Sequence, residues 1–185
     1  MRLLLGLLGL VGFVALVQAL PDDALKQIFW NKTVAGDFGA WANYQTAVVF
    51  ANHSMWIGGM KYQSYSEPLI VKLIIGGHLK FTSWHETPLG FSYPYIFDTK
   101  TAPVGFKDPR SSSIPAGATP YHIRFNKEGI LTYNGKNKFV GCRNEEMAKL
   151  HTFQIWWQGA GPLEGWNCST PLIFYAGSPS ASDYY

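Results

Sequence analysis

Cysteine and charge are both scarce in this chain of 185 residues. Its only cysteines are Cys142 and Cys168, and only 15% of its residues are Asp, Glu, Lys or Arg. Two cysteines without a C-x-x-C spacing do not make a thiolate zinc site. The formal net charge is +3 and the basic residues are scattered, which argues against a nucleic-acid partner. An apolar content of 47% excludes a disordered chain.

Catalytic and metal-binding motifs are also missing. The sequence has no H-E-x-x-H, no G-x-S-x-G and no glycine-rich phosphate loop. Its 12 acidic residues are spread out, and no pair stands out for glycoside hydrolysis. His85-Glu86 beside Trp84 could serve a general acid–base mechanism, but neighbours on a strand point to opposite faces. We therefore expect a non-catalytic protein without a metal or another cofactor.

The only long apolar run lies at the start of the sequence. Met1-Arg2 is a short positive start, and Leu3 to Val17 is interrupted only by glycines. With Val17-Gln18-Ala19 as a cleavage site, this is the pattern of a secretory signal peptide over residues 1–19. The run is shorter than the roughly 20 residues of a spanning helix, so an uncleaved anchor is the less favoured alternative. We expect a secreted, extracellular chain with no membrane contact after cleavage.

Export gives a role to the cysteines and to three asparagines. In an oxidising compartment Cys142 and Cys168 are expected to form a disulfide. Asn31, Asn52 and Asn167 each begin an N-x-[ST] sequon and would carry an N-linked glycan at the surface. The third sequon is the least favourable, because its middle residue is a disulfide candidate.

Short β-rich segments separated by turn residues fill most of the remaining chain. These segments are 46–51, 54–57, 69–75, 78–84, 122–125, 130–133, 138–142, 152–157 and 172–175. Turn signals such as Gly76-Gly77 favour hairpins between them. The pattern predicts one all-β domain over 20–177, either a sandwich or a barrel, with a β-trefoil also compatible, followed by a polar tail over 178–185.

Two segments depart from this pattern. Residues 20–30 carry Pro21, two aspartates and apolar residues at helical spacing, and they predict a short N-terminal helix, with an extended arm as the alternative. Residues 88–120 contain six prolines and a serine run, and they predict a long surface loop with little regular structure. Aromatic residues in that loop indicate that it packs against the body of the domain.

Aromatic residues are abundant, with 7 Trp, 10 Tyr and 12 Phe. In an exported β-protein they fill the core or form a platform on which sugar rings stack. On one strand, Trp156 and Trp157 would point to opposite faces. Trp84, Trp157 and Trp166 are the candidate stacking residues, and the core is the alternative for each.

Five phrases and a cysteine carry a family resemblance. They are Ala51-Asn-His-Ser-Met-Trp-Ile-Gly-Gly59, Gly77-His-Leu-Lys-Phe-Thr-Ser-Trp-His85, Ile114-Pro-Ala-Gly117, Asn137-Lys-Phe-Val-Gly-Cys142 and Phe153-Gln-Ile-Trp-Trp157, followed by Cys168. Over about residues 48–176 the chain resembles the small fungal cell-wall proteins of the PhiA type. The resemblance implies a secreted, wall-associated, glycosylated β-protein without known catalysis. The chain lacks the early cysteine pair of such proteins and matches them poorly over 88–120.

Three functions follow as hypotheses. The first is a non-catalytic protein of the fungal wall with a structural or developmental role and cell-wall polysaccharide as its partner. The second is a secreted carbohydrate-active enzyme or carbohydrate-binding module, with His85 or Glu86 in a cleft for the enzyme. The third is a secreted effector or allergen-like protein that binds other proteins. Whether the tryptophans form an exposed strip or a buried core is the structural observation that bears on them most directly.

Overall fold

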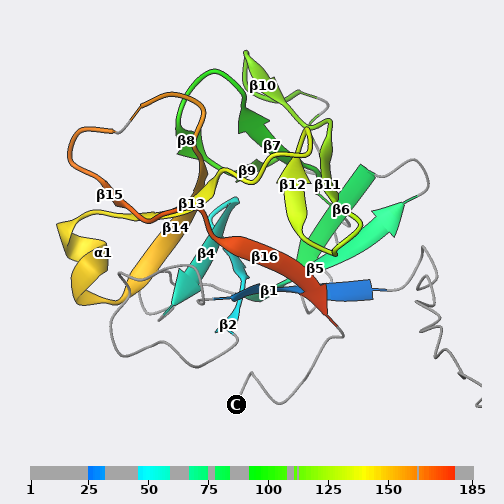
Figure 1. The fold of residues 1–185 in the computed structure, drawn as a ribbon, viewed down its shortest axis with the longest axis horizontal. Helices are drawn as coiled ribbons and strands as arrows, with labels where there is room; N and C mark the ends of the chain where they lie inside the picture. Colours follow the sequence, from blue (N-terminus) through cyan, green and yellow to red (C-terminus); the bar gives the residue numbers. More distant parts are fainter. Residues whose placement is uncertain are drawn as a thin grey trace, which may run out of the picture.

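The computed structural model describes residues 25–31, 46–58, 67–74, 78–83, 92–107, 111, 113–161 and 163–177. They form an all-β fold in which a curled antiparallel sheet makes a half-barrel (Figure 1). The predicted all-β class is therefore confirmed, and the curvature matches a barrel better than a sandwich. The expected signal peptide and tail lie outside the described residues, as do Trp84, His85 and Glu86.

The main sheet has 14 strands, and its recorded strand pairs are antiparallel. They are β1 (Leu25–Asn31), β2 (Thr46–Ala47), β3 (Val49–Ala51), β4 (Ser54–Gly58), β5 (Glu67–Ile74), β6 (His78–Ser83), β7 (Pro94–Phe97), β8 (Ala102–Pro103), β9 (Gly105–Phe106), β10 (Ala118–Thr119), β13 (Phe139–Arg143), β14 (Thr152–Trp157), β15 (Asn167–Cys168) and β16 (Ile173–Gly177). A separate hairpin is formed by β11 (Ile123–Phe125) and β12 (Leu131–Tyr133). The longest path of paired strands runs β10-β7-β9-β4-β3-β5-β1-β16.

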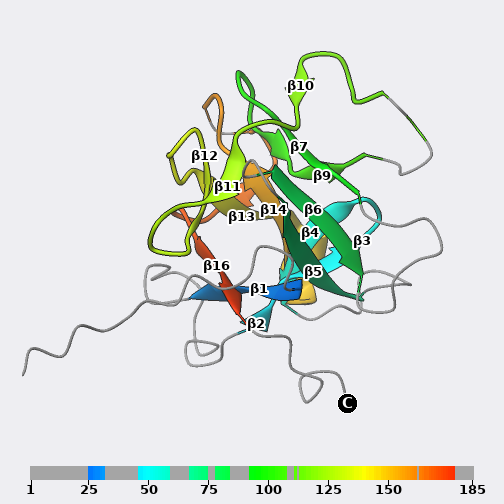
Figure 2. The same ribbon diagram turned by 90° about the vertical axis from the view of Figure 1, so that its right-hand side faces the viewer.

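The segment 167–177 pairs with two separate parts of the curled sheet. It begins beside β13, where Cys168 pairs with Cys142 and the Leu172 N–H donates to the Phe139 carbonyl at 2.8 Å. It continues as β16, which pairs with β1 and lies next to it in Figure 2. The strand pairs and this connecting segment together run around one core, a path we call the sheet circuit.

One large hydrophobic cluster lies inside this circuit. Its bulkiest fully buried members are Phe81, Phe139, Trp157 and Phe174. Burying each such side chain stabilises the fold by about 1.5–3 kcal/mol, so this cluster is the main source of stability.

A short helix, α1 (Glu145–Lys149), connects β13 to β14. The Asn144 side chain caps it by accepting a hydrogen bond from the Met147 N–H at 2.8 Å, as expected for an N-cap asparagine. No helix in the described part of the chain has the length and apolar character needed to cross a membrane.

The predicted N-terminal helix over 20–30 is wrong in its described part, because residues 25–31 form strand β1, as the extended alternative implied. Gln27 pairs with Ile70 of β5 on one side and with Gly177 of β16 on the other. Apolar residues at a few positions of a short segment fit a helix and a strand equally well. Partners that are distant in sequence decide the outcome here.

The predicted proline-rich loop is also wrong over residues 92–107, where three short strands form, and residues 118–119 add a fourth, whereas 113–117 contain no strand. β7 pairs with β9 and β10, and β8 pairs with β14. Ile96 and Phe106 are buried in the main cluster, which confirms that the segment packs on the body of the domain. Pro94 begins β7 and Pro103 ends β8, positions at which proline costs little ladder bonding.

Two hairpin turns use backbone in the left-handed region. Asn52 and His53 connect β3 to β4 with φ of 44° and 55°. Asn134 and Gly135, with φ of 48° and 71°, form the turn after β12. Positive φ at both central residues is the mark of a type I′ turn, and asparagine tolerates it well.

Candidate functional site

The outer face of β4 and β14 brings three tryptophans together. Ser54, Trp56, Gln154 and Trp156 alternate with residues of the main cluster and therefore point away from it. Trp166, from the segment after β14, packs against both smaller clusters on this side. We call these five residues the tryptophan face.

The indoles of this face differ in exposure. Trp56 and Trp156 are 4% and 6% exposed, whereas Trp166 is only partly buried. The Trp156 and Trp166 rings are tilted at 51° with their centroids 4.7 Å apart. Such contacts hold aromatic rings in place and contribute about 0.5–1.5 kcal/mol beyond area burial. Trp166 is therefore a positioned indole that is partly exposed to solvent.

A chain of hydrogen bonds orders the polar groups of the face. The Trp156 indole N–H donates to Gln154 Oε1 at 3.2 Å, and Gln154 Nε2 donates to Ser54 Oγ at 3.1 Å. Ser54 Oγ donates in turn to the Val104 carbonyl at 2.8 Å. The Gln154 amide is half-buried and fixed in orientation, and a primary amide has a second N–H donor that these bonds leave for a ligand.

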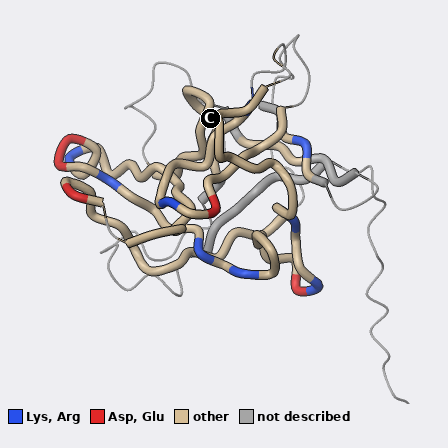
Figure 3. Tube along the Cα trace, turned by 90° about the horizontal axis from the view of Figure 1, so that it is seen from above, with Lys and Arg blue, Asp and Glu red and all other residues tan. Residues whose placement is uncertain are grey.

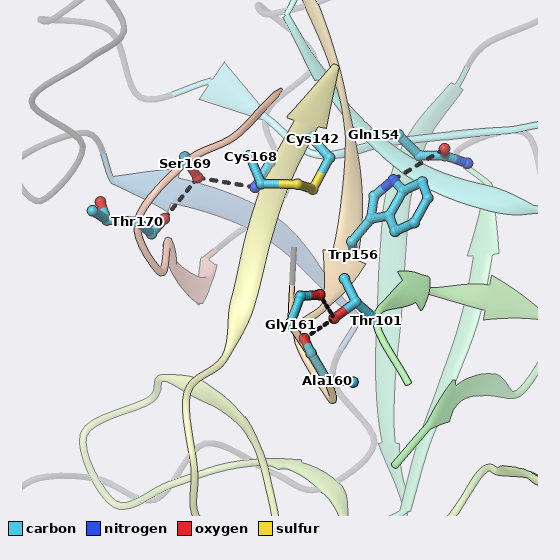
Figure 4. The surroundings of a disulfide bond; sticks show 10 residues. Thr101, Cys142, Gln154, Trp156, Ala160, Gly161, Cys168, Ser169 and Thr170 are labelled. Atoms are coloured by element: carbon cyan, nitrogen blue, oxygen red, sulfur yellow. Dashed lines mark hydrogen bonds between the residues drawn. A yellow bond between two sulfur atoms is a disulfide. The ribbon is translucent and has the colours of Figure 1, made fainter. Parts of the chain in front are cut away.

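Thr101 anchors the start of the segment between β14 and Trp166 (Figure 4). Thr101 Oγ1 donates to the carbonyls of Ala160 and Gly161. Gly159 lies so close to residues 98–100 that a Cβ there would be 2.6 Å from the Asp98 and Lys100 carbonyl oxygens. These contacts tie the segment after β14 to the loop between β7 and β8.

The predicted disulfide is confirmed. Cys142 and Cys168 are joined at an S–S distance of 2.02 Å between β13 and β15 (Figure 4). Beside the bridge, the Gly141 N–H donates to Ser169 Oγ at 3.0 Å, and Ser169 Oγ donates to the Thr170 carbonyl. Cys142 and Cys168 pack with Trp156 and Trp166 in one cluster, so the bridge borders the tryptophan face.

Trp157 is wrong as a stacking candidate. It is 2% exposed and lies edge-on to Tyr133 and Phe139, each with a centroid separation of 5.1 Å. The alternation along β14 turns Trp157 into the main core and Trp156 to the outer face. Of the three tryptophans proposed from the sequence, Trp166 stays a candidate and Trp84 lies outside the described residues.

The three sequon asparagines lie at different places in the fold. Asn52 is exposed in the β3–β4 turn, and Asn167 is exposed in β15 opposite Arg143. Asn31 ends β1, and its side chain is not among those described.

Titratable groups do not gather at one place in the described part. The acids with described side chains are exposed, namely Asp98, Glu128, Glu145, Glu146 and Glu164. His53, His122 and His151 are exposed turn residues with positive φ. No three or more His, Cys, Asp or Glu among the described residues could hold a metal ion together. Figure 3 shows the charged residues spread over several loops.

The pKa values of two tyrosines, Tyr133 and Tyr175, are raised by their surroundings. Burial raises the pKa of Tyr133, and the charge and hydrogen bonding of the Asp98 carboxylate raise it further. Burial also raises the pKa of Tyr175. A raised pKa keeps a phenol protonated, so neither shift prepares a nucleophile or a general base at neutral pH.

Comparison with known proteins finds no relative: no family model, no curated protein and no solved structure matches this chain. The resemblance to PhiA-type proteins stays a prediction, and function has to be argued from the tryptophan face.

Sequence reasoning missed most of this face, although part of the signal was present. The strand phrase Phe153-Gln-Ile-Trp-Trp157 places Gln154 and Trp156 on one face by alternation alone. The contribution of Ser54, which precedes Gln154 by 100 positions, depends on the pairing of β4 with β14.

Proposed function

We propose that this chain is a secreted, non-catalytic glycoprotein of the fungal cell wall, with a structural or developmental role, that contacts wall polysaccharide through Trp166 and Gln154, the two partly exposed members of the tryptophan face. The observation that carries the proposal is the partly exposed indole of Trp166, which packs at a tilt against Trp156, whose own N–H is bonded to the Gln154 amide. Binding sites for small polar ligands combine aromatic surface with a few placed polar groups. An indole covers the apolar face of a sugar ring, while an amide bonds its hydroxyls.

Rigidity of the face supports binding. Trp156 and Gln154 hold each other through a hydrogen bond, and the loop that carries Trp166 is tied to Thr101. Side chains that are ordered before binding lose little entropy when a ligand arrives. A polymer offers many equivalent sugar rings, so a weak site of this kind gains from repeated contact along the wall.

Binding to insoluble polysaccharide tests the proposal. The mature chain is mixed with chitin or with β-glucan particles, and the protein left in solution is measured. We expect Trp166→Ala to weaken binding about two- to tenfold, the loss of one aromatic contact. Tyr121→Ala is the control, since Tyr121 is 58% exposed and lies outside the tryptophan face.

Two results would contradict the proposal. One is a wild-type chain that binds none of the wall polysaccharides. The other is a Trp166→Ala variant that binds as the wild type does, with both variants shown to be folded by urea unfolding. Release of soluble sugars during the assay would instead favour the hypothesis of a carbohydrate-active enzyme. Retention of a specific partner in a host-extract pull-down, without polysaccharide binding, would favour the effector hypothesis.

A further inference from the structure

Asn52 stands at the tip of the β3–β4 hairpin. It is exposed, has a φ of 44° and begins the sequon Asn52-His53-Ser54. A glycan on this side chain would project from the turn into solvent without displacing a core residue. The position is therefore compatible with a modified asparagine in the folded protein.

Ser54 supplies the hydroxyl of this sequon, and that hydroxyl is buried and hydrogen-bonded in the folded protein. It is 4% exposed, donates to the Val104 carbonyl and accepts from Gln154 Nε2. Asparagine glycosylation requires the hydroxyl at the third sequon position and an accessible backbone. In the folded protein this hydroxyl is buried and hydrogen-bonded, so transfer to Asn52 is expected before folding.

The partners that bury Ser54 are synthesised after it, which leaves time for the glycan transfer. The partners of Ser54 lie 50 and 100 positions further along the chain. At about 5–20 residues per second, synthesis of that stretch takes about 3–20 s. The β3–β4 hairpin cannot close the sequon stably before then, because an isolated two-stranded hairpin is marginal in water.

The partners of the Asn167 sequon, unlike those of Ser54, precede it in the chain. Cys142 precedes Cys168 by 26 positions, and Gly141, whose N–H bonds Ser169 Oγ, precedes Ser169 by 28. The β13 strand that receives this sequon is therefore already synthesised when Asn167 emerges. Disulfide formation at the middle residue then competes directly with modification.

We propose that Asn52 carries an N-linked glycan added before folding, and that the Asn167 sequon is left unmodified because pairing with β13 closes it first. The donor is a lipid-diphosphate-linked oligosaccharide of the export route. The Asn52 amide nitrogen forms a bond to the anomeric carbon of the first sugar and loses one proton. The bond from that carbon to the diphosphate oxygen breaks, and the lipid diphosphate leaves with its electron pair. The inference rests on export, as in the proposed function.

Site mapping on secreted protein is the first test. The full chain is expressed in a fungal secretory host, and glycans are removed by an amidase in heavy-oxygen water, which labels each formerly modified asparagine for mass spectrometry. We expect label at Asn52 and none at Asn167. Secreted protein without label at Asn52, or with equal label at both positions, would overturn the inference. Failure of export would contradict the proposed function instead.

Variants test the timing. Asn52→Asp, which suits the same turn conformation, should abolish the mobility shift due to this glycan, and Asn167→Asp should leave it unchanged. Cys142→Ala keeps the Asn167 sequon intact but removes the competing disulfide, so we expect label to appear at Asn167. An Asn167 that stays unmodified in Cys142→Ala would overturn the competition step.

A transfer assay separates the order of events. The unglycosylated full chain, folded or reduced and unfolded, is given purified oligosaccharyltransferase and lipid-linked donor. We expect Asn52 to be modified in the unfolded chain only. Equal modification of the folded protein would show that the buried Ser54 hydroxyl is no barrier.

Discussion

At the scale of single residues, the close approach of Gly159 to the backbone of residues 98–100 holds the segment that carries Trp166. A Cβ at this position would meet the Asp98 and Lys100 carbonyl oxygens at 2.6 Å, whereas a Cβ on Gly161 would have no heavy atom within 4 Å. Gly159→Ala forces main-chain movement, and we expect it to lower the free energy of unfolding by about 1–3 kcal/mol. Gly161→Ala should leave it nearly unchanged. Urea unfolding of both variants measures this, and equal stabilities would contradict the contact.

Because of Tyr133, the free energy of unfolding should fall as the pH becomes alkaline. Its folded-state pKa is raised by burial and by Asp98, so above about pH 10 the unfolded chain loses the phenolic proton first. The contribution is fully present below that pH and is lost as the pH rises toward the folded-state pKa. Tyr175 acts in the same direction.

We expect the unfolding free energy to fall between about pH 9 and pH 11, and to fall less steeply in Tyr133→Phe. Because the variant also loses the interaction with Asp98, the slopes with pH are compared and not the absolute values. Parallel slopes for wild type and variant would show that Tyr133 does not carry the effect.

Single residues also mark the limit of prediction at the candidate site. Alternation along 152–157 predicts that Trp156 and Trp157 face opposite sides, but it does not say which side is the core. Trp157 belongs to the main cluster, because its ring packs against those of Phe139 and Tyr133 there. Trp166, a stacking candidate from the sequence, is partly exposed, but its contact with Trp156 did not follow from the sequence pattern.

At the scale of elements, β1 shows how distant partners override local pattern. Gln27 pairs on both sides, with Ile70 and with Gly177. Proline at this position removes a backbone donor from a central strand, where it is not tolerated. We expect Gln27→Pro to unfold the domain or to destabilise it by about 3 kcal/mol or more.

Gln27→Thr is the matched control, because a β-branched residue suits a strand and the N–H is retained. Thermal unfolding followed by circular dichroism compares the two variants. A Gln27→Pro variant as stable as Gln27→Thr would mean that β1 is not a central strand.

The strand segments of the middle and C-terminal parts of the chain were mostly predicted, and the proline-rich segment was not. Runs such as 138–142 and 152–157 combine β-branched and aromatic residues with turn signals, and they form β13 and β14. In 92–107 the prolines suggested a loop, yet short strands can place proline at their ends. Burial of Ile96 and Phe106 then outweighs the poor local propensity.

At the scale of the whole molecule, the disulfide joins β13 to the segment that completes the sheet circuit. In the chain-entropy model, closing a loop of 26 positions stabilises the fold by about 3–4 kcal/mol. We expect the double variant Cys142→Ala/Cys168→Ala to lose about this amount, measured by urea unfolding. The reduced wild type should behave similarly, and an unchanged midpoint in both would contradict a stabilising role.

The sequence alone determined the all-β class, the disulfide partners and several strands, because these depend on local alternation, turn residues and the presence of only two cysteines. The tertiary structure decided the strand state of 25–31, the inclusion of 92–107 in the sheet and the composition of the tryptophan face. Each of these depends on contacts between residues far apart in sequence, such as Ser54 with Gln154. Such contacts follow from strand order and sheet curvature, which one sequence does not specify by its local pattern.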